Sequence, residues 1–435
     1  MKIGAISLGC DKNRVDTEKM LSRLTQSGHT LVGSEEEADV IIVNTCAFID
    51  KAKEESIDEI LNAISAKNGS KKKKVIVTGC LAQRYADDLK KEFPEVDAIL
   101  GIADYDEIVS TVENVCKGNK VYDCANLDKF YDGRVLTTPY HYAYLKIADG
   151  CDNHCTYCAI PSIRGKYRSE KTEDLLKEAQ KLSDDGVKEL IIVAQDVTRY
   201  GTDWDGKPHL TELLDKLSAL DFEWIRLLYL YPEMVDDALI KYVLDNPKIV
   251  KYMDIPLQHI DDVVLKRMNR RTNEKSVREL IAKLKKAGIA IRTTFICGFP
   301  GETSEQFEKL KDFVKETKFD YAGFFAYSRE EGTPADRLDG HLDDAVKQAR
   351  ADELGAIQTQ IIEERNATLV GKRLRVIYDD IDYDRQKFVG RCSTQAPDID
   401  NVVYFTSEQR VQVGNFYDVL VEGTDGIDLT GRVIE

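Results

Sequence analysis

The sequence has no long apolar run and little proline or tryptophan. Its longest apolar stretch, residues 40–49, is about half the roughly 20 residues that a membrane helix requires. Only 10 of the 435 residues are proline and two are tryptophan, and no low-complexity tract is present. This composition excludes a membrane-spanning or largely disordered chain, and the length predicts two or three folded domains.

Basic residues are fewer than acidic residues. There are 61 lysines and arginines against 77 aspartates and glutamates, so the formal net charge is −16. This balance argues against a protein that holds nucleic acid mainly through phosphate contacts. Residues 1–8 form a strand-like run without the apolar core of a secretory signal, so we expect a cytoplasmic protein. Thiols are kept reduced there, so the ten cysteines are expected to bind metal or pack rather than form disulfides.

The apolar pattern predicts an α/β protein with three domains. Residues 1–125 alternate short apolar runs with amphipathic stretches, which indicates an open, mostly parallel α/β domain. A linker is expected over 126–140, and residues 137–368 alternate six strands with helices, which is typical of a partial (β/α)6 barrel. Residues 370–435 are rich in short strands and predict a small antiparallel β-barrel. The strands are expected near residues 3–8, 40–44, 75–78, 98–100, 142–148, 189–194, 224–229, 252–257, 290–296, 320–326, 374–378, 387–391, 401–405 and 417–422, with a long helix over 343–369.

Three cysteines follow the first predicted barrel strand in a C-x3-C-x2-C loop: Cys151, Cys155 and Cys158. Active sites of barrels lie at the carboxyl ends of their strands. Three thiolates can hold three irons of a four-iron cluster and leave the fourth iron open to a small chelating molecule. A structural zinc site is the alternative, but it needs four ligands, and His154 inside the loop is badly placed to be the fourth. The spacing therefore favours an open iron–sulfur cluster.

Three further cysteines, Cys10, Cys46 and Cys80, each end a predicted parallel strand of the first domain. The carboxyl ends of parallel strands lie at one edge of a sheet, so residues far apart in sequence can meet there. They could hold a second cluster, again with an open iron. Small cysteines packed at strand ends are the alternative, since free cysteine is often simply buried. The other four cysteines share no such spacing and are expected to be structural; they are Cys116, Cys124, Cys297 and Cys392.

The cysteine loop is similar to the signature of the radical S-adenosylmethionine (SAM) enzymes, and Tyr157 fits the aromatic position of that signature. A three-cysteine α/β unit, this barrel and a β-rich tail, in that order, resemble the methylthiotransferase family of radical SAM enzymes over essentially the whole chain. The tail is similar to the TRAM domain, a small β-barrel often used for RNA binding. Its formal charge of −4 over residues 370–435 makes direct RNA binding doubtful and suits a basic protein partner. An ordinary solvated surface is the alternative explanation of that charge.

Two segments resemble one branch of the family, which modifies a ribosomal protein. Residues 7–18 read Ser-Leu-Gly-Cys-Asp-Lys-Asn-Arg-Val-Asp-Thr-Glu, in which Asp11 departs from the proline common in that branch. The branch that modifies tRNA typically has Gly-Cys-Gln-Met-Asn there. It also differs where this chain has Pro-Leu-Gln-His at 256–259. Both segments favour a protein substrate.

The resemblance implies a reaction that replaces a C–H bond by C–S–CH3 at the β-carbon of an aspartate, in the twelfth protein of the small ribosomal subunit. It assigns the catalytic cluster to Cys151, Cys155 and Cys158, where SAM is cleaved to a 5′-deoxyadenosyl radical. A second cluster on Cys10, Cys46 and Cys80 would present the sulfur. The expected cofactors are therefore two 4Fe-4S clusters and SAM. An external electron donor and a sulfur source are the further partners.

Four residues that follow predicted barrel strands are candidate SAM contacts beside Tyr157. They are Gln195, Asp196, Gln258 and Gly298, and each lies on the expected catalytic face. For Gly298, in a Gly-Phe-Pro-Gly segment, an ordinary turn is the alternative. Three other functions remain open: a tRNA adenosine methylthiotransferase, a non-catalytic iron–sulfur electron-transfer protein, and a zinc-binding interaction module.

Overall fold

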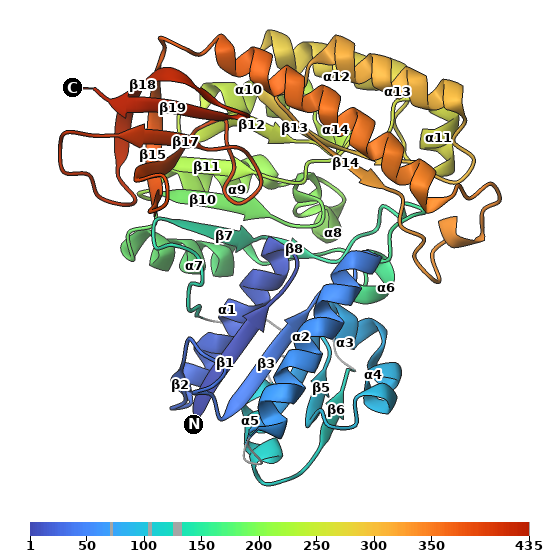
Figure 1. Cartoon of the computed structure of the whole chain (residues 1–435), viewed down its shortest axis with the longest axis vertical. Coiled ribbons are helices and arrows are strands. Elements are labelled where there is room, and N and C mark those ends of the chain that lie inside the picture. Colours follow the sequence, from blue (N-terminus) through green and yellow to red (C-terminus); the bar gives the residue numbers. More distant parts are fainter. Residues whose placement is uncertain (70–72, 103–106, 125–132, 435) are drawn as a thin grey trace. The chain divides into compact units, whose positions relative to one another are not determined.

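The computed structural model describes residues 1–69, 73–102, 107–124 and 133–434, which form two compact units (Figure 1). Part of the linker expected over 126–140 lies outside the described residues. Unit 1 comprises Met1–Thr137, Lys146–Glu178 and Ser328–Asp336, and unit 2 comprises Thr138–Leu145, Ala179–Tyr327 and Arg337–Glu435.

Unit 1 contains a six-stranded sheet in which every neighbouring pair is parallel, in the order β2-β1-β3-β4-β5-β6. Strand β3 has the sequence Val-Ile-Ile-Val-Asn-Thr and is buried at all six positions, as expected for a strand covered on both faces. Helix α2 packs on β3 and β4, while α1 packs on α5. The elements of this unit are β1 (Lys2–Ser7), α1 (Asp11–Gln26), β2 (Thr30–Leu31), β3 (Val40–Thr45), α2 (Asp50–Asn68), β4 (Lys74–Gly79), α3 (Cys80–Arg84), α4 (Ala86–Glu92), β5 (Ala98–Leu100), α5 (Ile108–Cys116), β6 (Val121–Asp123), β8 (Ala148–Asp149), α6 (Ile160–Arg164), β9 (Arg168–Ser169) and α7 (Thr172–Asp184), of which the last continues into unit 2.

The strand order of unit 1 reverses between β1 and β3. From β1 the chain passes to β2 on one side, and it then returns to add β3, β4, β5 and β6 on the other side. Ligands of open α/β sheets bind at such a reversal, in the crevice outside the carboxyl ends of the strands. The fold therefore creates a binding position where β1 and β3 end.

Unit 2 contains a second six-stranded sheet, in the order β14-β13-β12-β11-β10-β7, which confirms the partial barrel. The run predicted as one strand over 142–148 is divided, because residues 148–149 turn away to pair with β9. The elements are β7 (Tyr142–Lys146), β10 (Glu189–Val193), η2 (Val197–Arg199), α8 (Thr202–Asp205), α9 (Leu210–Ser218), β11 (Trp224–Leu227), η3 (Pro232–Met234), α10 (Asp237–Asp245), β12 (Ile249–Asp254), α11 (Asp262–Arg267), α12 (Glu274–Lys286), β13 (Ala290–Cys297), α13 (Ser304–Thr317), β14 (Tyr321–Ala326), η4 (Ala335–Arg337) and α14 (Asp344–Ala367). The last residue of β7 and the first two residues of η4 belong to unit 1.

The chain after α14 forms a closed five-stranded barrel, in the order β15-β16-β17-β19-β18. This confirms the small β-barrel and adds a strand, β19, that was not predicted. The expectation of an antiparallel barrel needs one correction, because β17 and β19 pair in parallel. Strand directions cannot alternate all the way around a ring with an odd number of strands, so one parallel pair is unavoidable. The strands are β15 (Arg373–Asp382), β16 (Lys387–Cys392), β17 (Val403–Thr406), β18 (Phe416–Asp425) and β19 (Asp428–Val433).

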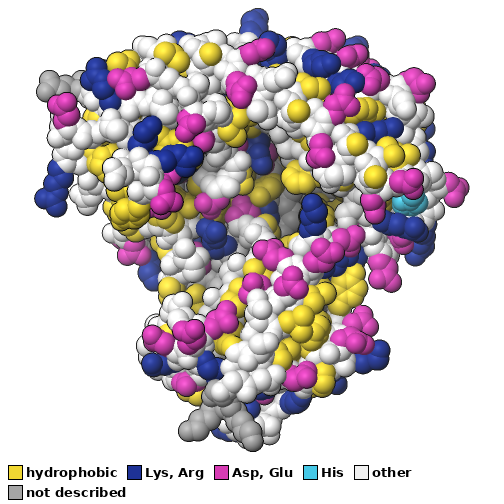
Figure 2. Space-filling view, in the orientation of Figure 1, with side chains coloured by type: hydrophobic (Ala, Val, Ile, Leu, Met, Phe, Trp, Pro, Cys, Tyr) yellow, Lys and Arg dark blue, Asp and Glu magenta, His cyan; other side chains and the backbone are white. Residues whose placement is uncertain are grey.

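Acidic and basic side chains are interspersed on the face that Figure 2 shows. None of the helices in the described residues is long and apolar enough to cross a membrane.

A chain of buried ion pairs connects the small barrel to the sheet of unit 2. Glu189 on β10 accepts a hydrogen bond from Arg226 Nε at 2.6 Å and another from Arg391 Nη1 at 2.8 Å. Arg391 on β16 also donates to the two carboxylate oxygens of Asp379 at 2.7 and 3.0 Å. Burial alone would raise the pKa of Glu189, but the charges of the two arginines outweigh it and lower that pKa. Glu189 is therefore an ionised, paired carboxylate inside unit 2.

Substitution of Glu189 by glutamine should destabilise unit 2 by about 3–5 kcal/mol at neutral pH, because it leaves buried arginine charge uncompensated. The arginines lower the folded-state pKa of Glu189. Its contribution is therefore complete above about pH 4.3, the value for an unfolded glutamate, and is lost as the pH falls through the lower folded value. Urea unfolding of the parent and the Glu189→Gln protein, followed by circular dichroism from about pH 3 to about pH 8, measures the difference on both sides of the unfolded value of about 4.3.

Asp245 supplies the matched control, because it pairs with Lys241 on the exposed face of α10. Asp245→Asn should change the free energy of unfolding by no more than about 0.5 kcal/mol. Equal effects of the two substitutions would contradict the importance given to the buried pairs.

Candidate functional site

Three cysteines lie at the carboxyl ends of three adjacent strands in unit 1. Cys10 follows β1 and precedes α1, Cys46 follows β3 directly, and Cys80 follows β4 as the first residue of α3. Cys46 and Cys80 are buried and Cys10 is half-buried, and none of the three forms a disulfide. Cys10 and Cys46 lie where the strand order reverses, and Cys80 lies at the end of the neighbouring strand on the same edge.

Glycines in a left-handed conformation bring two of these strand ends close together. Gly9 has φ +81°, and a Cβ atom at this position would lie 2.7 Å from Cys46 Sγ. Gly79 has φ +94°, and a Cβ atom there would lie 2.3 Å from Asn44 Oδ1 and 2.5 Å from the carbonyl oxygen of Thr45. Any larger residue at either position would push the following cysteine away from its neighbour.

Asn13 and Ser56 fix the backbone around Cys10 and Cys46. Asn13 Nδ2 donates hydrogen bonds to the carbonyl oxygens of Leu8 at 2.7 Å and of Thr45 at 3.2 Å, which joins the ends of β1 and β3. Ser56 Oγ accepts from the backbone N–H of Cys46 at 3.0 Å and donates to its carbonyl oxygen at 2.9 Å. The two thiols are therefore carried on backbone that is held by buried side chains.

The three thiols influence one another electrostatically. Burial raises the pKa of Cys80 to about 12; the positive charge of Arg164 opposes this rise, and Cys10 and Cys46 add to it. Burial also raises the pKa of Cys46, with Cys10 again adding to the effect. Thiolate is the form that binds metal, so loading these positions with iron releases protons.

The second set of thiols lies on one loop of unit 1, between β8 and α6. Cys151 and Cys155 are buried and Cys158 is half-buried. The loop begins at Gly150, which has φ +76° and where a Cβ atom would lie 2.1 Å from the carbonyl oxygen of Lys166. The backbone N–H of Cys151 donates to Gly165 at 3.1 Å, and that of Cys158 donates to Cys155 at 3.0 Å. The structure thus places the whole triplet on a short, backbone-bonded loop.

Both cysteine sets fit an iron–sulfur cluster better than a single metal ion. Among the described residues, no group of three His, Cys, Asp or Glu side chains is arranged to hold one ion. A four-iron cluster takes one thiolate on each iron, so its ligands are farther apart than those of a single zinc ion. Thiolate is also the usual ligand of iron–sulfur clusters. The thiol donors of both sets therefore suit an iron–sulfur cluster.

Four candidate SAM contacts lie at the carboxyl edge of the sheet in unit 2. Gln195 and Asp196 follow β10, Gln258 follows β12 in a left-handed conformation with φ +71°, and Gly298 follows β13 with φ +74°. The backbone N–H of Gly298 donates to the buried carboxylate of Glu302 at 2.9 Å. The fifth candidate, Tyr157, lies within the cysteine loop of unit 1.

The side chains of Asp196 and Gln258 differ in their hydrogen bonds within the protein. Asp196 is buried and accepts a hydrogen bond from the backbone N–H of Thr198 at 3.1 Å, so it caps η2. Gln258 Oε1 is buried and has no hydrogen-bond partner in the part of the chain that is described. An unsatisfied buried oxygen is costly unless a ligand donates to it. Gln258 is therefore a residue of this group that fits a polar ligand.

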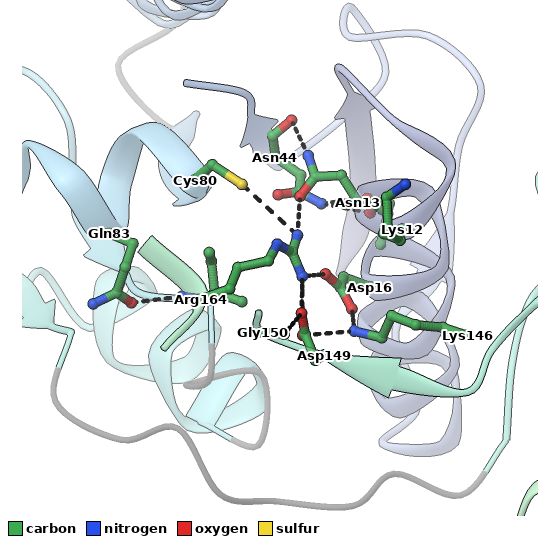
Figure 3. Close-up of polar contacts among 12 residues, drawn as sticks. Lys12, Asn13, Asp16, Asn44, Cys80, Gln83, Lys146, Asp149, Gly150 and Arg164 are labelled. Atoms are coloured by element: carbon green, nitrogen blue, oxygen red, sulfur yellow. Dashed lines mark hydrogen bonds and ion pairs between the residues drawn. The ribbon is translucent and has the colours of Figure 1, made fainter. Parts of the chain in front are cut away.

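Arg164 is a functional candidate that the sequence did not single out. It lies at the end of α6, its side chain is 1% exposed, and it reaches Asp16, Asp149 and Cys80 (Figure 3). Burial alone would raise the pKa of Asp149, but the charges of Arg164 and Lys146 hold it well below its usual range. The sequence pattern around this arginine indicated no partner for its side chain.

Comparison with known proteins gives matches along the whole chain. Residues 2–101 match Uncharacterized protein family UPF0004, residues 145–314 the Radical SAM superfamily, and residues 370–434 the TRAM domain. The ribosomal protein uS12 methylthiotransferase RimO of Clostridium botulinum is 46% identical over 441 residues, which cover 99% of this chain and 98% of that protein. The protein of the same name from Caldanaerobacter subterraneus subsp. tengcongensis is 48% identical over 435 residues, with 99% of each chain covered.

A solved structure also resembles this one. The radical S-adenosylmethionine methyltransferase TsrM from Kitasatospora setae, with cobalamin and a [4Fe-4S] cluster bound, superimposes with a TM-score of 0.56. The superposition covers 77% of this chain and 76% of that chain at 13% sequence identity. At this identity the similarity is one of fold.

Gly79→Ala should weaken iron binding at the strand ends, because its Cβ atom would meet backbone and side-chain oxygen at less than 3 Å. The measurement uses a chain in which Cys151, Cys155 and Cys158 are replaced by alanine, so that bound iron reports only on Cys10, Cys46 and Cys80. After anaerobic reconstitution, iron in the Gly79→Ala protein should fall below about half of its parent's value.

Gly118→Ala is the control, since Gly118 has φ +89° and a Cβ atom there would meet nothing within 4 Å. This substitution costs about 1–2 kcal/mol for the left-handed backbone alone and should leave iron binding intact. Full iron content in the Gly79→Ala protein would contradict the assignment of this glycine.

Proposed function

The chain belongs to the RimO family of ribosomal protein uS12 methylthiotransferases, and from this premise we propose that it adds a methylthio group to the β-carbon of an aspartate in uS12. The observation that carries the proposal is the presence of two three-thiol sets in unit 1, one at the strand ends and one on the loop. Each set leaves one iron of a four-iron cluster without a protein ligand. Two open irons suit a reaction with two tasks, radical formation and sulfur delivery.

The β-carbon of an aspartate carries no proton that a side-chain acid or base could remove at an accessible pKa. When bound, an iron–sulfur cluster and SAM supply the 5′-deoxyadenosyl radical that can take a hydrogen atom from such a carbon. We assign this cluster to Cys151, Cys155 and Cys158. Burial of Cys151 and Cys155 keeps water from that side of the loop, which protects a radical reaction from side reactions.

We assign a second 4Fe-4S cluster to Cys10, Cys46 and Cys80, at the reversal of strand order in unit 1. Its role is to present the sulfur that becomes the methylthio group. The SAM contacts proposed are Tyr157, Gln195, Asp196, Gln258 and Gly298, with Gln258 supported by its unsatisfied buried oxygen. Reductive cleavage of SAM consumes an electron and each turnover removes a sulfur, so an external electron donor and a sulfur source are required.

The proposed division into domains is 1–125, 137–368 and 370–435, supported by the three matched segments. A protein that modifies a ribosomal protein acts where ribosomes are assembled, and we therefore propose the cytoplasm as its location. Because the tail matches the TRAM domain, an adenosine of tRNA is the alternative acceptor of the methylthio group. The formal charge of −4 on residues 370–435 favours the basic protein over RNA.

The proposal is tested with protein that is purified and reconstituted without oxygen and then incubated with SAM, a reductant, and either uS12 or unmodified tRNA. Mass spectrometry should detect a methylthio group on an aspartate of uS12. Cys151→Ala should abolish both SAM cleavage and methylthio transfer. Cys10→Ala should abolish transfer but leave SAM cleavage, since the loop cysteines remain.

Cys116→Ala is the control, because Cys116 is an exposed thiol of α5 outside both sets. It should retain both activities. A methylthio group on tRNA instead of uS12 would overturn the proposed substrate, and transfer by the Cys10→Ala protein would overturn the role of the strand-end thiols.

A further inference from the structure

Arg164 connects the two cysteine sets of unit 1 through opposite sides of its guanidinium group (Figure 3). Nη1 lies 3.0 Å from Asp16 Oδ2 and 2.9 Å from Asp149 Oδ2. Nη2 faces away from these carboxylates and lies 3.7 Å from Cys80 Sγ and 3.4 Å from Asn13 Oδ1. The planar group thus presents one edge to the acidic residues and the other to a strand-end thiol.

The carboxylates tie Arg164 to the start of the cysteine loop. Asp149 Oδ1 accepts a hydrogen bond from the backbone N–H of Gly150 at 2.9 Å, and Gly150 directly precedes Cys151. Lys146 pairs with both Asp16 and Asp149. The two cations and two anions balance, so the cluster of four residues carries no net formal charge. What reaches Cys80 is therefore mainly the directed N–H group of Nη2.

Hydrogen bonds to the ligating sulfurs are one of the features that set the reduction potential of an iron–sulfur cluster. Reduction adds negative charge that is shared with the thiolate ligands, so a donor aimed at a ligating sulfur stabilises the reduced state more than the oxidised state. Such a donor raises the reduction potential. Arg164 is placed to do this at Cys80, on the backbone of the loop that carries the other cysteine set.

We propose that Arg164 is a positioning residue that raises the reduction potential of the cluster held by Cys10, Cys46 and Cys80, through the hydrogen bond from Nη2 to Cys80 Sγ. This inference rests on the proposed function, because it requires a cluster at the strand ends. Its second consequence is mechanical. The same guanidinium group pairs with Asp149, so it holds Cys80 and the start of the Cys151 loop at fixed positions within unit 1.

The experiment uses the full chain with Cys151, Cys155 and Cys158 replaced by alanine, so that one cluster remains. Anaerobic reconstitution should give about four irons per chain. A redox titration followed by electron paramagnetic resonance then gives the potential of that cluster. Arg164→Lys keeps a positive charge for Asp16 and Asp149 but loses the forked donor. It should shift the potential in the negative direction by about 59 mV, which is a tenfold change in the ratio of oxidised to reduced cluster for one electron.

Asp149→Asn is a second variant with the opposite expectation. It removes an anion that neutralises the guanidinium group, so the potential should become more positive, and this shift should be smaller when Arg164→Lys is also present. If Arg164→Lys fails to assemble a cluster, Asp149→Asn alone decides the question, because an unchanged potential in that protein would overturn the inference. Arg134→Lys is the control for a buried arginine, because Arg134 pairs with Glu18 and Glu178 and should leave the potential unchanged.

The outcomes separate the inference from the function on which it rests. Absence of iron in the parent chain would overturn the strand-end cluster and thus the proposed function. An assembled cluster whose potential is the same with arginine and lysine at position 164 would overturn the inference alone. So would equal shifts in the Arg164→Lys and Arg134→Lys proteins, since a general loss of packing would then explain both.

Discussion

The candidate site depends on one constraint of parallel sheets, namely that all strands of such a sheet end at the same edge. Cys10, Cys46 and Cys80 are 36 and 34 positions apart in the sequence, yet each follows a strand of one sheet directly or by a short turn. No local turn could bring such distant residues together. The left-handed glycines before Cys10 and Cys80 complete the arrangement, because only a residue without a Cβ atom allows the backbones to approach so closely.

The sequence predicted this edge because the strands can be recognised from short apolar runs, each followed by a cysteine. It also predicted the six strands of the partial barrel and the long helix α14, whose patterns are strong and local. It did not predict β19, which follows β18 after a two-residue turn, nor the parallel pairing that closes the small barrel. The pairing of β17 with β19 depends on closure of the ring, so it cannot be predicted from the local composition of either strand.

Buried ionic groups were the other feature beyond sequence reasoning. Arg164, Glu189 and Arg391 resemble ordinary surface charges in the sequence, but each is less than 3% exposed and is neutralised by partners from distant segments. Burying such groups gains little stability, because desolvation offsets most of the Coulomb attraction. Their effect is on arrangement: Glu189 fixes the small barrel to the sheet of unit 2, and Arg164 fixes a cysteine loop to strand ends within unit 1.

The number of electrons in the new C–S bond explains why a donor at the position of Arg164 would matter for the reaction. A methylthiolate contributes an electron pair to a new bond, and a carbon radical contributes one electron. The C–S bond holds two electrons, so one electron is left over in every transfer and must be accepted near the sulfur donor. Under the proposed assignment, Cys10, Cys46 and Cys80 would hold a cluster that could accept this electron. A hydrogen bond that raises its potential makes this acceptance more favourable. The residue that fixes the geometry of the two cysteine sets would then also favour the electron transfer that completes the reaction.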